Sequence, residues 1–324
     1  MDSGVVESSV DVSVILVSYN TRALLQPCID RLAAALASVQ SQVFIVDNAS
    51  RDGSVQLLRE RYSHLEIVEN AANVGFGRAN NQVLGQALGR YVLLLNTDAY
   101  VEPDAVTKCI AYMEEHPRCG VLGTRLVGAD GSLQPSCRGF PTPWNVFLLR
   151  TGLSRYFSSV RMMDDPRRHL SEVQSCDWVP GCFYLVRRAV IDAIGLFDPR
   201  FFLYYEEVDH CVAVKKAGWE VTYFPEVTVV HLGGESAKAD GDLSSQGRQI
   251  SVLQAESELL FFRKHHGLAG AWLFLVSSGL ADVFLAIKGL VRGSGRNSLR
   301  RTWQNVRLAV RVFVATRAGS RATR

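Results

Sequence analysis

The residues best suited to chemistry are Asn96, Thr97 and Asp98, which directly follow an apolar run at residues 91–95. Such a run predicts a strand buried on both faces, and open α/β sheets bind ligands at the carboxyl ends of their strands. Asp98 offers the hard oxygen ligand that Mg²⁺ prefers, and Asn96 a weaker neutral one. A cation held there could bind a diphosphate. The alternative is an Asx turn, with a helix starting at Pro103.

Three other apolar runs, at residues 12–17, 43–46 and 65–68, also end in polar residues. The polar residues that follow them are Ser18, Tyr19 and Asn20, then Asp47, Asn48 and Ser50, then Asn70, Asn73 and Gly75. Helical patterns at about residues 24–39 and 55–62 separate these runs, and this alternation predicts a parallel, doubly wound α/β sheet. Right-handed crossovers would bring all four polar strand ends to one edge, which indicates a nucleotide site.

Five motifs, in this order, resemble those of family 2 inverting glycosyltransferases with the GT-A fold, and within that family bacterial rhamnosyltransferase-like enzymes. They are VSYN (17–20), VDNASRDGS (46–54), NVGFGRAN (73–80), LNTDAYVEP (95–103) and GLFDPRFFLYYEEVDHCVAVKKAGW (195–219). The resemblance covers about residues 10–235. It implies a mostly parallel sheet, with a Rossmann-like nucleotide-binding half and an acceptor half.

The resemblance also implies which residues hold the sugar nucleotide. Asp47 is expected to receive the base and ribose, in a pocket lined by Ser18, Tyr19 and Asn20. The other residues expected on the donor and acceptor side are Asn48, Asn73, Gly75, Phe76, Arg78, Asn80, Asn96, Thr97, Trp178, Gly181 and Glu206. For two of these an ordinary structural role is equally compatible with the sequence: Arg78 could face solvent, and Trp178 could lie in the core.

Glycosyl transfer must neutralise charge on the departing diphosphate and remove a proton from the acceptor hydroxyl. The resemblance implies a divalent cation, Mg²⁺ or Mn²⁺, held by Asp98 and completed by His231. It places the general base at Glu207, where the family more usually has Asp, and Asn96 stands where the family often has a second acid. The alternatives are a structural histidine at 231 and acids that only complement a helix dipole.

Length and composition fit an enzyme domain at residues 1–265 with a helical appendage at residues 266–324. The seven cysteines form no CxxC pair, which predicts reduced thiols in a cytosolic protein. The N-terminus lacks the basic region of a signal peptide. Residues 233–249 are polar and rich in glycine, and we expect a lid over the site, with an ordinary linker as the alternative.

The net charge of +3 is unevenly distributed. From Lys288 to the end there are nine arginines and no acid, a charge of +10, so the rest of the chain carries −7. The preceding residues 268–291 are apolar apart from Asp282 and Lys288, and Asp282 would be costly in a membrane span. We expect a helix in the cytoplasmic membrane interface or packed on the catalytic domain, then a basic amphipathic segment at residues 300–314 on anionic lipid. The alternative is an oligomer interface.

Together these features predict an inverting, metal-dependent glycosyltransferase on the cytoplasmic face of the membrane, acting in cell-surface polysaccharide synthesis. The resemblance implies a dTDP- or UDP-sugar donor, with dTDP-rhamnose first, and a glycan or polyprenyl-linked acceptor. A non-catalytic sugar-nucleotide or polysaccharide binding protein is the main alternative. A dinucleotide-dependent oxidoreductase would need a glycine-rich turn before the first helix, which VSYNTRALL lacks. Nucleic acid is a poorer partner, since no known binding module accompanies the arginines.

Overall fold

The computed structural model describes residues 10–157, 171–233, 248–291 and 295–324, so most of the expected lid lies outside the described residues. The chain forms two compact units, which are described separately. The first is built from Met1–Cys137, Arg168–Asp198 and Glu207–Ser245. The second is built from Arg138–Arg167, Pro199–Glu206 and Gln246–Arg324.

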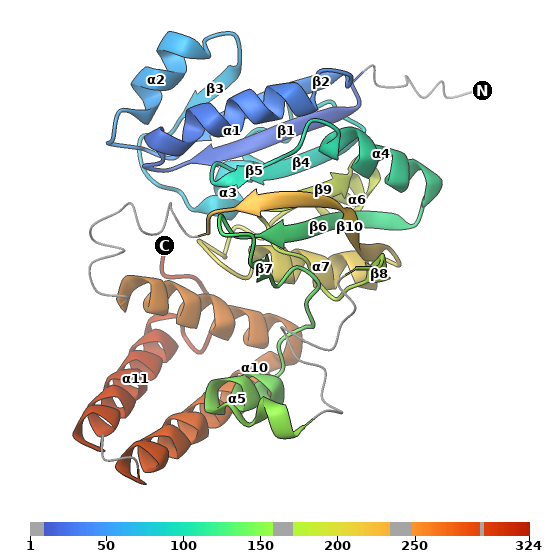
Figure 1. Cartoon of the computed structure of the whole chain (residues 1–324). Helices are drawn as coiled ribbons and strands as arrows, with labels where there is room; N and C mark the ends of the chain where they lie inside the picture. The colour runs from blue at the N-terminus through green and yellow to red at the C-terminus, as the bar shows by residue number, and fades with distance from the viewer. Residues whose placement is uncertain (1–9, 158–170, 234–247, 292–294) are drawn as a thin grey trace. The chain divides into compact units, whose positions relative to one another are not determined.

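The described residues of the first unit form a ten-stranded mixed sheet of order β3-β2-β1-β4-β9-β6-β10-β5, with β7 on β6 and β8 on β10 (Figure 1). The strands are β1 Val12–Ser18, β2 Ser41–Asp47, β3 Glu66–Glu69, β4 Tyr91–Asn96, β5 Ala99–Tyr100, β6 Cys119–Val127, β7 Leu133–Gln134, β8 Gln174–Ser175, β9 Phe183–Arg187 and β10 Glu220–His231. Strands β1 to β4 are parallel to one another, whereas β9 runs antiparallel to both of its neighbours.

The register of the parallel strands brings their polar ends together. Ser18 pairs with Asp47, Val17 with Asn96, and Asp47 with Glu69. The α/β sheet and the common edge predicted from the four apolar runs are therefore confirmed.

Helices cover both faces of this sheet. They are α1 Arg22–Ala35, α2 Ser54–Arg61, α3 Phe76–Asn81, α4 Ala105–Glu115, α6 Arg188–Ile194 and α7 Glu206–Lys216. Alternate residues of β9 point to opposite faces. Phe183 and Leu185 belong to the core that contains the apolar residues of α1 and α4. The hydroxyl of Tyr184 lies 2.8 Å from His210 Nδ1, which fixes α7 against the other face (Figure 1).

The structure corrects one expectation about the cysteines. Cys137 and Cys176 form a disulfide, with their Cα atoms 5.4 Å apart. They are 39 residues apart in the sequence, and no local spacing motif marks the pair. The other five cysteines are buried free thiols, and burial raises the pKa of Cys28 to about 12. The prediction of reduced thiols is therefore wrong for Cys137 and Cys176.

The second unit is helical. Its elements are α5 Pro143–Thr151, the 3₁₀ turn η1 Leu153–Tyr156, α10 Arg248–Val291 and α11 Gly295–Ala315. A capping box between Thr142 and Asn145 starts α5. Gly267, with φ 66°, kinks α10 close to the predicted domain boundary at residue 265, and that boundary stays a prediction. Past the kink, the ring of Phe274 stacks on Phe262 with centroids 4.6 Å apart.

The acid within the apolar run is paired inside this unit. Asp282 is 6% exposed, and its Oδ1 lies 2.7 Å from Arg150 Nη2 and accepts a 2.9 Å hydrogen bond from Asn305 Nδ2. In the described part of the chain, Val252–Val291 is long and apolar enough, by length and composition alone, to cross a membrane.

Candidate active site

Asn48 links the polar residues that follow three of the strands by hydrogen bonds. Its backbone N–H donates to the carbonyl of Ser18 at 2.8 Å. Its side-chain Nδ2 donates to Asn73 Oδ1 at 2.8 Å, and its Oδ1 accepts from the N–H of Val74 at 2.9 Å. The loops after β1, β2 and β3 are therefore connected by hydrogen bonds, and together they form one wall of the candidate site.

The backbone of this wall is strained at two residues that are not glycine. Asn20 has φ 52° and Ala49 has φ 69°. The Asn20 turn is held in place because its N–H donates to Ser50 Oγ at 2.9 Å and its Oδ1 accepts from the N–H of Arg51 at 2.7 Å. Positive φ at such residues costs energy and is concentrated at ligand sites.

Asp47 presents an unsatisfied acceptor in this wall. Its side chain is 1% exposed, and Oδ1 accepts from the N–H of Ser50 at 2.8 Å. The other oxygen, Oδ2, is buried and makes no hydrogen bond with any described residue. An unpaired buried carboxylate oxygen is costly, typically by about 1–3 kcal/mol or more. A ribose hydroxyl or a base N–H would satisfy it.

Asp98 and His231 face each other from neighbouring elements. His231 ends β10, where it pairs with Ala99 of β5, and its Nε2 lies 3.5 Å from Asp98 Oδ1. The other ring nitrogen, Nδ1, lies 2.8 Å from Gln134 Oε1, and Gln134 Nε2 donates to the His231 carbonyl at 2.8 Å. Since an amide oxygen only accepts, Nδ1 carries the proton, and the lone pair of Nε2 in a neutral ring faces Asp98.

This arrangement fits a divalent cation. Metal-bound histidines usually donate their second ring N–H to an oxygen, as His231 does to Gln134. Among the described residues no cluster of three or more histidine, cysteine or acidic side chains could hold a metal. Mg²⁺ is usually bound through one or two carboxylates, with water and phosphate oxygens completing its shell, so Asp98 with a diphosphate fits this pattern and His231 would add a nitrogen ligand.

Glu207 lies at the start of α7, beside two other predicted site residues. A Cβ placed on Gly181 would lie 3.9 Å from Glu207 Cβ and 3.8 Å from Phe76 Cε1, so this glycine brings the chain close to both. The two residues before the acid pair, Tyr204 and Tyr205, have φ 69° and 70°. Glu207 itself is half-buried.

Three other predicted site residues are buried or half-buried. Trp178 is 3% exposed, which is compatible with the core alternative. Asn80 Nδ2 donates to the Phe76 carbonyl at 2.9 Å, and Arg78 is half-buried. Their roles as site residues stay predictions.

Two site residues were missed by the sequence reasoning. The hydroxyl of Thr21 lies 3.0 Å from Thr97 Oγ1 and 3.4 Å from Ser18 Oγ, in a buried group of three hydroxyls. Gln134 orients His231. Gln134 lies in the two-residue strand β7, and no sequence motif marks it. Thr21 directly follows the VSYN motif, and this adjacency was the one signal available for it.

A mixed α/β sheet with these groups at the carboxyl edge of its parallel strands has the arrangement in which open α/β sheets bind their ligands. Residues 13–192 match the family model described as Glycosyl transferase family 2. This match spans more than half of the chain, and the chain belongs to glycosyl transferase family 2.

Two curated relatives are rhamnosyltransferases. The N-acetylglucosaminyl-diphospho-decaprenol L-rhamnosyltransferase of Mycobacterium tuberculosis is 29% identical over 236 residues, which is 66% of this chain and 75% of the relative. The rhamnosyltransferase WbbL of Escherichia coli K12 is 25% identical over 182 residues, which is 53% of this chain and 66% of the relative.

Solved glycosyltransferases share the fold. The mannosyltransferase PcManGT from Pyrobaculum calidifontis, in complex with GDP-Man and Mn²⁺, has a TM-score of 0.55 and 17% identity, covering 95% of this chain and 89% of that one. GalNAc-T7 with UDP, GalNAc and Mn²⁺ has a TM-score of 0.52 and 14% identity, covering 78% of this chain and 51% of that one. The GT-A fold implied by the motifs is confirmed.

Proposed function

We propose that this chain transfers rhamnose from dTDP-rhamnose, with inversion, to a hydroxyl of a polyprenyl-linked glycan during cell-surface polysaccharide synthesis. The observation that carries the proposal is the Asp98–His231 pair beside the wall that contains Asp47. The choice of sugar and acceptor is supported by the two rhamnosyltransferase relatives, one of which is named for a decaprenol-linked acceptor.

On the donor side, the unsatisfied oxygen of Asp47 would accept a hydrogen bond from the nucleoside. Asp98 and His231 would hold Mg²⁺ or Mn²⁺, which when bound offsets the negative charge that develops on the departing diphosphate. Gln134 keeps the His231 ring in the tautomer whose Nε2 can bind a metal.

On the acceptor side, Glu207 would remove the proton from the attacking hydroxyl. The hydroxyl oxygen forms the new bond to the anomeric carbon while the bond to the diphosphate breaks and its electron pair leaves with the nucleotide. The proton ends on the Glu207 carboxylate. A single displacement on the face opposite the leaving group inverts the anomeric carbon, as in inverting glycosidases.

The test is a transfer assay with purified chain, Mn²⁺ and a polyprenyl-diphosphate N-acetylglucosamine acceptor. We expect sugar on the acceptor from dTDP-rhamnose and at least tenfold less from UDP-glucose or GDP-mannose. Anomeric coupling in the product should show inversion. Retained configuration would contradict the mechanism. Nucleotide binding without transfer from any donor would favour a sugar-nucleotide binding protein instead.

We also propose that the second unit holds the enzyme on the inner membrane face. The part of α10 after Gly267 exposes apolar side chains, and α11 exposes both arginines and apolar residues. The exposed large apolar residues are Leu268, Trp272, Leu273, Val276, Leu280, Val283, Leu285, Ile287, Leu290 and Val291 on α10, and Leu299, Trp303, Val306, Val310 and Val314 on α11. The inward position of Asp282 removes the acid from this surface. Apolar side chains combined with basic ones favour anionic interfaces.

Vesicle co-sedimentation tests this placement. Each arginine near an anionic surface contributes about 1 kcal/mol, so Arg300→Gln with Arg307→Gln should weaken binding to anionic vesicles roughly thirtyfold. The control removes the same charge from the first unit by Arg59→Gln with Arg118→Gln, and binding should not change. Equal loss in both double variants, or equal binding to zwitterionic vesicles, would contradict a specific role for α11.

A further inference from the structure

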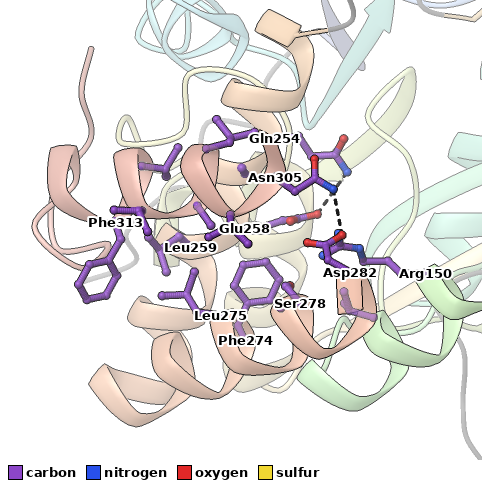
Figure 2. A pocket seen from close by; sticks show the side chains of 18 of the residues that line it. Arg150, Gln254, Glu258, Leu259, Phe274, Leu275, Ser278, Asp282, Asn305 and Phe313 are labelled. Atoms are coloured by element: carbon purple, nitrogen blue, oxygen red, sulfur yellow. Dashed lines mark hydrogen bonds and ion pairs between the residues drawn. The ribbon is translucent and has the colours of Figure 1, made fainter. Parts of the chain in front are cut away.

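The second unit contains a cavity of about 640 Å³ between α5, α10 and α11 (Figure 2). Its volume falls within the range of about 300–1,000 Å³ that is usual for ligand pockets. Much of the wall is apolar, with Leu259, Trp272, Phe274, Leu275, Val310 and Phe313 among its residues.

The polar residues of the wall leave little net charge. Arg150 is paired with Asp282, and Asn305 donates to the same carboxylate oxygen (Figure 2). Burial raises the pKa of Glu258 to about 7, against the opposing effects of the Arg150 charge and of hydrogen bonds from Gln254 and Tyr205. Glu258 therefore carries less negative charge at neutral pH than an exposed glutamate would. Because Arg150 is paired with Asp282 and the charge of Glu258 is reduced, this wall favours an uncharged occupant.

The protein's own side chains do not fill the cavity at Ser278 and Gly279. Ser278 is 9% exposed and lines the cavity, and its Oγ makes no hydrogen bond with any described residue. A serine within a helix ordinarily bonds back to a preceding carbonyl. At the next residue, a Cβ built on Gly279 would meet no atom within 4 Å. Because Gly279 also lines the cavity, this open space leaves room for a ligand beside α10.

We propose that this cavity holds part of the isoprenoid chain of the lipid-linked acceptor, an inference that rests on the proposed function. A long uncharged hydrocarbon matches the wall, and each methylene withdrawn from water contributes about 0.8 kcal/mol. The helices that enclose the cavity also carry the exposed apolar face proposed to meet the membrane, which is where such a chain resides. A fatty acyl chain of a bilayer lipid is the competing occupant.

Photolabelling of the full chain on anionic vesicles tests the site. The probe is geranylgeraniol with a diazirine on its chain, and adducts are mapped by mass spectrometry. We expect adducts on cavity residues, and at least tenfold better competition by unlabelled geranylgeraniol than by oleyl alcohol. Equal competition by oleyl alcohol would overturn the isoprenoid assignment.

A cavity-filling variant with a matched control sharpens the test. Gly279→Leu adds a side chain into the open space and replaces a helix-interior glycine with a residue that favours helices by up to about 1 kcal/mol, so it should fold. Labelling should fall at least tenfold. Ala269→Leu places the same leucine side chain at an exposed position of α10 outside the cavity, and labelling should persist. Equal labelling of both variants would overturn the proposal.

Transfer kinetics separate this inference from the proposed function. Gly279→Leu should raise KM for a long-chain polyprenyl acceptor at least tenfold and leave transfer to a short-chain, water-soluble analogue unchanged. If KM for the long-chain acceptor does not change, the cavity does not hold the acceptor chain. If the parent transfers to no acceptor, the proposed function is wrong, and photolabelling alone then decides whether the cavity binds an isoprenoid.

Discussion

Glu207→Gln is expected to lower the rate of sugar transfer by about 10²–10⁴-fold, the usual contribution of a general base. The amide keeps the size of the side chain but cannot accept the acceptor's proton. Since the contacts to the nucleotide are expected from Asp47 and Asp98, the Kd for the nucleoside diphosphate should stay within about twofold. The measurements are kcat by product formation and Kd by calorimetry.

Two further variants sharpen this result. Glu60→Gln makes the same change on an exposed turn of α2 and should leave kcat unaltered. Glu207→Asp gives the residue more usual in the family and should retain more transfer than Glu207→Gln, although the carboxylate shifts by about a bond length and such shifts are costly. Near-normal turnover in Glu207→Gln would remove Glu207 from the role of base.

Asp98→Asn should weaken Mn²⁺-dependent binding of the nucleoside diphosphate by at least about tenfold, since even partners that only orient a metal ligand contribute 10–100-fold. The substitution keeps the shape of a side chain that is 4% exposed and removes its charge. Calorimetric titration with and without Mn²⁺ measures the effect. With EDTA present, parent and variant should bind alike.

Gln134→Ala serves as the comparison for this site. It removes the group that holds His231 Nδ1 but leaves both expected metal ligands, Asp98 and His231, unsubstituted, so a smaller loss of Mn²⁺-dependent affinity is expected. An unchanged response to Mn²⁺ in Asp98→Asn would exclude the carboxylate from the metal site.

Much of the donor half could be predicted from the sequence because its signals are local. Buried parallel strands appear as unbroken apolar runs, and the polar residue that ends each run marks the edge of the sheet. Ser18, Asp47 and Asn96 were placed in this way, and the register confirms that their strands end together.

The remainder depends on pairings between residues far apart in the chain. β9 joins the sheet between β4 and β6, so that Leu95 pairs with Phe183, and no local pattern predicts that neighbour. The contact between Gln134 and His231 spans 97 residues. From the sequence alone, Asp282 is a costly charge in an apolar helix. In the structure it is paired with Arg150, which lies 132 residues earlier in the chain.

The most direct test of the donor site is a thermal-shift series with dTDP, UDP, GDP and NAD, each with and without Mn²⁺ or Mg²⁺. A bound ligand at 100 times its Kd adds about 2.7 kcal/mol to the free energy of unfolding. We expect stabilisation by a pyrimidine nucleoside diphosphate that depends on the metal, and its loss in Asp98→Asn. Stabilisation by NAD alone, or by no diphosphate under conditions where the chain is folded, would contradict a metal-dependent sugar-nucleotide site at this edge of the sheet.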